Sequence, residues 1–147
     1  MAAHDSDEVL MRQALQEAQA AGEAGEVPVG CVVVCQGRII ARAHNLTERL
    51  NDVTAHAEMQ AITAAAGYLG GKYLDECTLY VTVEPCPMCA SAMYWAHLQR
   101  LVYGTGDPKR GYSHFEGLLH PATEVTSGVL AEEAAGMMKD FFRQKRG

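Results

Sequence analysis

The chain has 147 residues, a length typical of one domain, residues 1–147, with its own hydrophobic core. Apolar residues make up 48% of it and charged residues 20%, as in ordinary globular proteins. No apolar run approaches the roughly 20 residues that a membrane span needs, and the start MAAHDSDEVL lacks the basic and apolar regions of a signal peptide. We therefore expect a cytoplasmic protein without a membrane anchor. The net charge of −6 argues against a surface that attracts nucleic acid as a whole.

The first third of the chain predicts a helix followed by two strands. SDEVLMRQALQEAQAA places acidic residues before an apolar stripe, which predicts a helix from about Asp7 to Ala21. VGCVVVC, residues 29–35, is a continuous apolar run typical of a strand buried on both faces. A turn at residues 36–37 then leads into RIIARAHN, which predicts an antiparallel return strand.

The rest of the chain alternates helices and strands, as in an α/β fold. The predicted elements are a helix over 55–66 ended by Gly67, a strand over 77–85 stopped by Pro85, a helix over 87–98, a strand over 100–106, a short strand within 123–128 and a closing helix over 129–146. The strand–helix–strand unit over 77–106 predicts a parallel pair with a right-handed crossover. We expect a three-layer α/β/α sandwich around a mixed five-stranded sheet.

Five cysteines in a chain without an export signal favour reduced thiols or a metal site over a disulfide framework. Cys86 and Cys89 form a Cys-x-x-Cys motif at the start of a predicted helix that follows a buried strand. Helix amides and the helix dipole favour thiolates at such a position, and zinc binds thiolates. The other three, Cys31, Cys35 and Cys77, fall on strands and are interpreted as core thiols.

His56 and Glu58 stand two residues apart at the start of another predicted helix. Side chains at this spacing do not share a helical face, so the two residues are expected to act separately. His56, Cys86 and Cys89 would give zinc three ligands and leave the fourth tetrahedral position open, the pattern of a catalytic site. Glu58 would then carry protons without binding the metal. We expect one zinc ion per chain.

A Cys-x-x-Cys motif alone also fits a thioredoxin-like redox pair or half of a structural zinc site. The Pro-Met interior of the motif and the separate His-Ala-Glu argue against a redox pair. The lack of a fourth ligand at suitable spacing argues against structural zinc. His-x-Glu followed by Pro-Cys-x-x-Cys is the signature of zinc deaminases.

Four blocks, EVPVGCVVV, HNLTERLNDVTAHAE, LYVTVEPCPMCASAM and FFRQKR, resemble those of bacterial tRNA-specific adenosine deaminases in the cytidine-deaminase-like superfamily. The resemblance covers nearly the full length of the chain. It implies zinc ligands at His56, Cys86 and Cys89, a proton shuttle at Glu58 and a base-contacting side chain at Asn45. The further pocket residues that the resemblance implies are Pro28, Val29 and Pro85.

The resemblance also implies partners. The substrate would be the wobble adenosine of a tRNA anticodon loop, converted to inosine, and the protein would be a homodimer. The apolar segment 91–98, with Tyr94 and Trp95, is the candidate dimer surface, with core packing as the alternative. The candidate RNA contacts are Lys109, Arg110, Arg143, Lys145 and Arg146.

The sequence departs from the family pattern at Val53, where the family has proline, and at Ser91, where it has glycine; the stretch 113–126 is shorter. These departures concern nucleic-acid contacts rather than the chemistry. Two other functions stay open. One is deamination of a free base or nucleoside such as guanine or cytosine, which suits the acidic charge. The other is a zinc-stabilised binding module without turnover, against which Glu58 argues.

Overall fold

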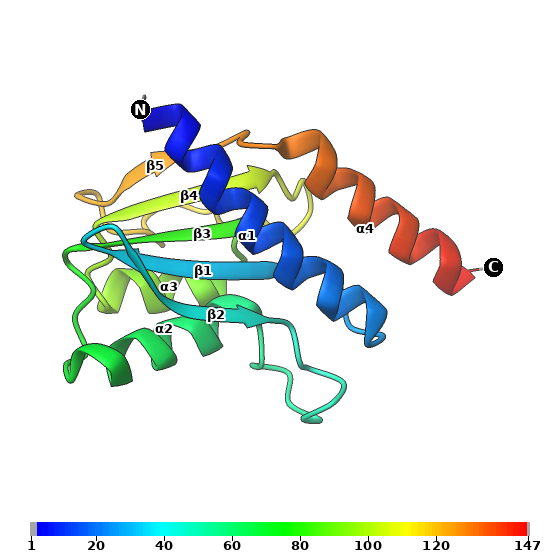
Figure 1. Cartoon of the computed structure of the whole chain (residues 1–147), viewed down its shortest axis with the longest axis horizontal. Coiled ribbons are helices and arrows are strands. Elements are labelled where there is room, and N and C mark those ends of the chain that lie inside the picture. The colour runs from blue at the N-terminus through cyan, green and yellow to red at the C-terminus, as the bar shows by residue number, and fades with distance from the viewer. Residues whose placement is uncertain (1–2, 147) are drawn as a thin grey trace.

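The computed structural model describes the backbone of residues 3–146 and the side chains of residues 6–145. Its elements in chain order are α1 (Ala3–Glu23), β1 (Gly30–Cys35), β2 (Arg38–His44), α2 (Ala57–Leu69), β3 (Cys77–Val83), α3 (Pro87–Trp95), β4 (Arg100–Thr105), the 3-10 helix η1 (Tyr112–His114), β5 (Glu124–Thr126) and α4 (Ala131–Arg146). The sheet lies between two helical layers, with α1 and α4 on one face and α2 and α3 on the other (Figure 1). The predicted α/β class with a mixed five-stranded sheet is confirmed.

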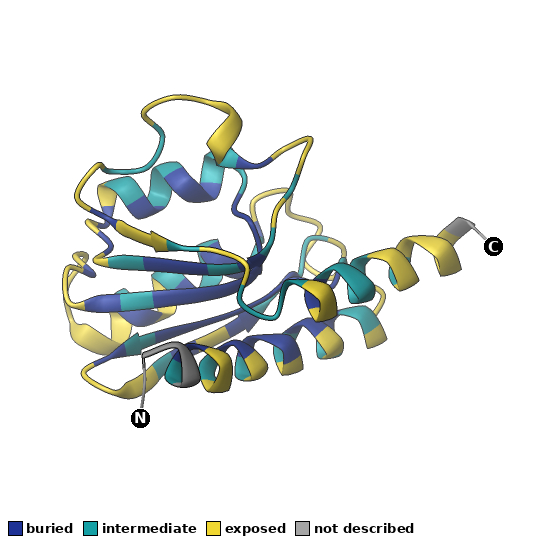
Figure 2. Ribbon diagram, turned by 90° about the horizontal axis from the view of Figure 1, so that it is seen from above, coloured by how far each residue is buried: buried dark blue, intermediate teal, exposed yellow. Residues whose placement is uncertain are grey.

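The sheet has the strand order β2-β1-β3-β4-β5. β1 is antiparallel to β2 and β3, whereas β3, β4 and β5 are parallel to one another. The predicted parallel pair across α3 is therefore confirmed. β1 and β3 are buried at almost every position, because helices cover both faces of the sheet centre (Figure 2).

Several predicted element ends are wrong by a few residues. Gly67 does not end α2; it lies inside the helix, and Gly70 ends it in the left-handed conformation with φ 71°. A glycine is tolerated within a helix, but the left-handed position after the last turn strongly prefers one. α3 ends at Trp95 rather than at residue 98, and His97 follows with φ 55°. The helix at Tyr112–His114 has no counterpart in the prediction.

The antiparallel pairing of β1 with β3 determines where a site can form. The start of β1 lies beside the end of β3, and the Gly30 N–H donates to Thr82 Oγ1 at 3.1 Å. α2 and α3 each begin near this end of the sheet, because α2 follows β2 and α3 follows β3. Two helix N-termini therefore meet at one end of the sheet.

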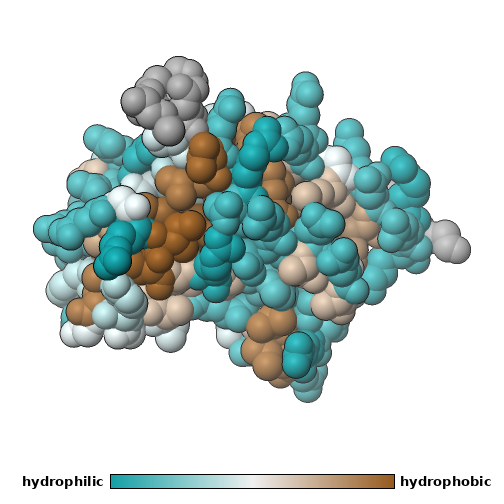
Figure 3. Space-filling view, in the orientation of Figure 1, coloured by the Kyte–Doolittle hydropathy of each residue, from teal (hydrophilic) through white to brown (hydrophobic). Residues whose placement is uncertain are grey.

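The outer faces of α1 and α4 carry mainly hydrophilic side chains, as expected for helices that form a surface layer (Figure 3). Within residues 3–146, no helix is both long enough and apolar enough to cross a lipid bilayer.

Candidate metal centre

His56 and Cys86 occupy equivalent places at the starts of α2 and α3. Each is the N-cap residue of its helix, has an extended backbone, and makes no hydrogen bond from its side chain to the first helical turn. Both side chains are instead directed into the space between the two helix starts. Cys89 lies one turn further along α3 and is fully buried. The prediction that His56 at one helix start and Cys86 and Cys89 at another share one metal agrees with this arrangement.

The three predicted ligand atoms have the spacing of a tetrahedral zinc site. His56 Nδ1 lies 3.6 Å from Cys86 Sγ and 3.5 Å from Cys89 Sγ. Zinc–sulfur bonds of about 2.3 Å and zinc–nitrogen bonds of about 2.05 Å at a tetrahedral angle place the two atoms about 3.6 Å apart. Among the described residues, these three form the group of His, Cys, Asp or Glu atoms close enough to share a metal, all within 4.8 Å of one another. The donor set therefore fits zinc.

The sulfur atoms of this group interact strongly. A hydrogen bond from Cys89, together with one from His56, lowers the pKa of Cys86 to about 4 against the opposing effect of burial. The pKa of Cys89 is raised, first by its hydrogen bond with Cys86 and then by burial. The hydrogen bond with Cys86 also raises the pKa of His56. The lowered pKa of Cys86 favours a thiolate between the helix starts, the form that binds a metal.

Glu58 lies in the first turn of α2 and is only 4% exposed. Burial raises its pKa to about 7, while its own backbone hydrogen bond, His56 and a hydrogen bond with Cys89 act in the opposite direction. The carboxyl group is therefore next to the metal-binding group without belonging to it. At neutral pH such a carboxyl can either take up or release a proton.

The residues expected to contact a base lie around this group. Asn45 is buried, and its Oδ1 accepts the Ala57 N–H at 2.8 Å, which stabilises the start of α2. The Asn45 N–H donates to Val29 O at 3.2 Å, which brings the segment before β1 alongside. Pro28 and Pro85 are also buried, and Pro85 O accepts the Tyr112 N–H at 2.9 Å. The structure therefore brings Asn45 and Val29 together, and it places Pro85 directly before Cys86.

Two buried glutamates, Glu26 and Glu84, hold the loops beside the site, and the sequence predicts neither role. Glu84 accepts the Asp107 N–H and the Ser113 N–H, each at 3.0 Å, and so fixes the loop 106–114. Glu26 accepts the backbone N–H groups of the loop after Asn45, at residues 48 and 49, at 3.0 and 2.8 Å. An acidic residue inside an otherwise apolar motif, as in EVPVG and TVEPC, is the signal that could have identified them.

The predicted RNA contacts fall into two groups. Lys109 and Arg110 are exposed on the loop 106–114, and their N–H groups donate to Asp107 Oδ1 at 3.0 and 2.9 Å. Arg143 and Lys145 are exposed on α4, where Arg143 pairs with Asp140 at 3.3 Å and Lys145 lies over the ring of Phe141. The side chain of Arg146 lies outside the described residues. The contacts of Arg143 and Lys145 are within α4 itself, so the structure does not join them to the site.

Known proteins resemble this chain in sequence over most of its length. The family described as the cytidine and deoxycytidylate deaminase zinc-binding region matches residues 4–105. The tRNA-specific adenosine deaminase of Bacillus subtilis is 49% identical over 147 aligned residues, which cover 95% of this chain and 91% of the relative. A solved structure from work on A-to-I editing by tRNA:A34 deaminases is 47% identical, with a TM-score of 0.82 over 86% of this chain and 96% of that one.

A guanine deaminase structure from Bacillus subtilis is 42% identical, with a TM-score of 0.65, over 67% of this chain and 64% of that one. Its match covers less of the chain than the match to the tRNA deaminases. The family match includes the three possible metal ligands and Glu58. The chain therefore belongs to the zinc-binding cytidine and deoxycytidylate deaminase family, and the tRNA-specific adenosine deaminases are relatives that match it over almost its whole length.

Proposed function

We propose that the protein is a zinc-dependent hydrolase that converts the wobble adenosine of tRNA to inosine with release of ammonia. The main support for this reaction is the buried Glu58 carboxyl, which lies beside a group of three possible ligands with tetrahedral spacing. A structural zinc site has no use for a buried carboxyl beside the metal that does not belong to the ligand group. The choice of tRNA is supported by the near full-length likeness to tRNA-specific adenosine deaminases.

The zinc ion is assigned to His56, Cys86 and Cys89. When bound there, it acts as a Lewis acid that lowers the pKa of water at the open fourth position. His56 enters from α2 and the two cysteines from α3. The helix starts supply partial positive charge that helps to keep both sulfurs as thiolates.

Glu58 moves the protons. Its carboxylate oxygen takes a proton from the attacking water and gives it to N1 of the adenine ring. The same carboxyl group then takes the remaining proton from the hydroxyl oxygen on C6 and gives it to the amine, which leaves as ammonia. Burial raises the pKa of the Glu58 carboxyl and so favours the protonated form that gives up the proton in the later transfers.

The base would be held by the residues that surround this group. Asn45 uses its Oδ1 to accept the Ala57 N–H, so its amide NH2 is the group assigned to the base. Pro28, Val29 and Pro85 are buried, and we assign their backbone to the same base pocket. An anticodon-loop base is already unpaired, so bringing it into this site costs little.

The RNA backbone is assigned to the basic side chains, which position the substrate without choosing the base. Lys109 and Arg110 are the better placed pair, because the loop that carries them is tied to Glu84 and Pro85 directly before Cys86. α4 extends toward the side of the molecule where β3 and β4 end, and it carries Arg143 and Lys145 in that direction (Figure 1).

We also propose that the protein is a cytoplasmic homodimer. Trp95 on α3 is 73% exposed, and Tyr94 contacts it edge-on at 5.6 Å between ring centroids. A large aromatic side chain that remains exposed on one chain is typical of a protein–protein contact. Trp95→Glu should therefore yield a monomer in sedimentation experiments, whereas core packing of this helix predicts misfolding instead.

A second candidate function is deamination of free guanine, which is favoured by the 42% identity to a guanine deaminase and by the net charge of −6. Ammonia release by the zinc-loaded protein distinguishes the two. The substrates are an anticodon stem-loop with adenosine at the wobble position, the same stem-loop with guanosine there, free guanine and free cytosine. We expect turnover of the first stem-loop alone. Turnover of free guanine without turnover of RNA would contradict the proposal.

A further inference from the structure

Two thiols face each other at the end of the sheet opposite to the metal centre. Cys35 is the last residue of β1, Cys77 is the first residue of β3, and the two are paired directly across the antiparallel ladder. Both are free cysteines, and both belong to the core beneath α2 and α3. Their places on two strands predict separate core thiols, whereas the fold pairs them.

The backbone places this pair at a site where the ladder has no mutual hydrogen bonds. The Cys77 N–H donates to Leu74 O at 3.1 Å rather than across to β1. Cys35 pairs with Arg38 across a two-residue turn, which directs its own backbone groups toward β2. In such non-hydrogen-bonded pairs the Cα atoms lie about 4.5 Å apart. Disulfides span Cα separations of about 4.4 to 6.8 Å, so a bond here needs no movement of the backbone.

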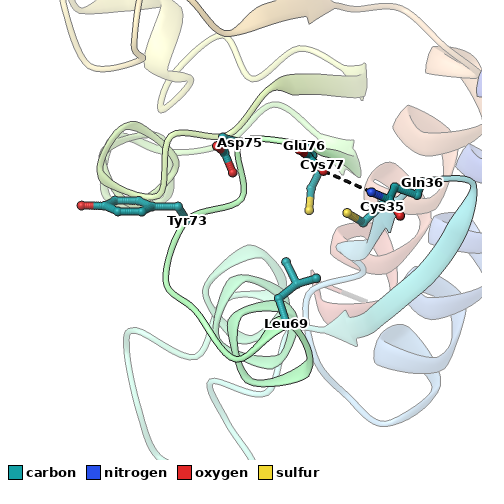
Figure 4. A pocket seen from close by; sticks show the side chains of 7 residues that line it. All are labelled: Cys35, Gln36, Leu69, Tyr73, Asp75, Glu76 and Cys77. Atoms are coloured by element: carbon teal, nitrogen blue, oxygen red, sulfur yellow. Dashed lines mark hydrogen bonds between the residues drawn. The ribbon is translucent and has the colours of Figure 1, made fainter.

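A pocket of about 230 Å³ lies beside this pair, and both Cys35 and Cys77 are among the residues that line it. Figure 4 shows the side chains of Cys35 and Cys77 projecting toward one another, with the Leu69 side chain directed at them from α2 and the Tyr73 ring directed away. Cys35 is 9% exposed and Cys77 is fully buried. A small oxidant would therefore reach Cys35 first.

The surroundings assign different roles to the two sulfurs. Burial, and next the hydrogen bond with Cys35, raises the pKa of Cys77 to about 12, and the charges of Asp75 and Glu76 add to this effect. Burial therefore favours the protonated form of Cys77. Cys35 is the more accessible sulfur and is the one that an oxidant reaches, and Cys77 lies directly across the ladder, where its sulfur can attack the oxidised Cys35.

We propose that Cys35 and Cys77 form a modification site, a dithiol that peroxides oxidise to a cross-strand disulfide. In the first step the Cys35 sulfur attacks one peroxide oxygen and the O–O bond breaks. Cys35 becomes a sulfenic acid, and the other peroxide oxygen takes the Cys35 proton and leaves as one water molecule. In the second step the Cys77 sulfur attacks the Cys35 sulfur. The S–S bond forms, the S–O bond breaks, and the hydroxyl group leaves with the Cys77 proton as a second water molecule. The two thiols are oxidised and the peroxide is reduced.

Peptide mapping tests this site. The zinc-loaded protein is treated with hydrogen peroxide, denatured in an alkylating reagent, digested and analysed by mass spectrometry. We expect a peptide pair joined through Cys35 and Cys77 that has lost two hydrogens, with Cys31 alkylated. Cys31→Ala is the matched control, because Cys31 lies on the same face of β1 opposite Val81 and has no thiol across the ladder. It should form the link as the wild type does, whereas Cys35→Ser should leave Cys77 alkylated.

Thermal unfolding provides the second readout. The link closes a long loop between β1 and β3, so oxidation should raise the thermal midpoint of the wild type by about 5 °C and leave that of Cys35→Ser unchanged. Recovery of Cys35 as a free thiol or a sulfinic acid, with Cys77 alkylated in the same wild-type sample, would overturn the proposal. A link between Cys35 and any other cysteine would overturn it as well.

Discussion

Replacing Glu84 should destabilise the protein and weaken its binding of the RNA substrate. The carboxylate is 7% exposed, and each of its two oxygens accepts one backbone N–H at 3.0 Å. Hydrogen bonds to a buried charged group contribute about 1.5–3 kcal/mol each. Glu84→Gln retains one oxygen and turns its NH2 group toward the other donor, so it should lose about 2 kcal/mol of unfolding free energy. Glu84→Ala leaves both donors unpaired and should lose about 4 kcal/mol.

Urea unfolding of the zinc-loaded variants measures this loss, and steady-state kinetics on the anticodon stem-loop measures its consequence. Because the loop 106–114 carries Lys109 and Arg110, Glu84→Gln should raise KM by about tenfold and change kcat little, with zinc content unchanged. Glu26→Gln is the matched control, since Glu26 also accepts two N–H groups but holds the other loop. A Glu84→Gln protein within about 0.5 kcal/mol of the wild type, with the same KM, would refute the anchoring role.

Three further predictions concern stability at acid pH, zinc binding by His56, and the basic residues Arg143 and Lys145 of α4. The hydrogen bonds from the loop outweigh burial and lower the pKa of Glu84, so its stabilising contribution is present above the unfolded pKa of about 4.3 and is lost as the pH falls through the folded value. Urea midpoints between about pH 6 and pH 3 should therefore fall more steeply in the wild type than in Glu84→Gln, and parallel curves would contradict this. His56→Ala removes the ligand from α2 and should leave well under one zinc per chain by elemental analysis, whereas full occupancy would rule it out as a ligand. Neutralising Arg143 and Lys145 together should raise KM for the stem-loop and reduce the salt slope by roughly one unit per lost phosphate contact. An unchanged slope would mean that these charges serve only the C-terminal end of α4.

Much of the fold follows from local patterns. The run at residues 29–35 is apolar at successive positions because helices cover both faces of β1, and that feature is visible in the sequence. The two helix starts at His56 and Cys86 could also be predicted, because proline, glutamate and small residues favour them locally. The ligand group then followed from the known preference of zinc for sulfur and imidazole.

The unpredicted features depend on contacts between distant parts of the chain. Asp7 looks like an ordinary first-turn acid, yet it is buried and pairs with Arg100 at 2.7 Å, and Tyr80 donates to it at 2.8 Å. The role of Glu84 could not be predicted for the same reason, because its partners are backbone N–H groups more than twenty residues away. No local pattern indicates which acidic side chain will meet such donors.

The most direct test of Glu58 as the proton carrier is the rate of inosine formation in an anticodon stem-loop by Glu58→Gln, with zinc measured in the same sample. Glutamine has nearly the same size and cannot carry the proton, so the variant should keep about one zinc per chain and lose at least 100-fold in deamination rate. A zinc-loaded Glu58→Gln protein that forms inosine within about tenfold of the wild-type rate would contradict the role of Glu58 in the reaction.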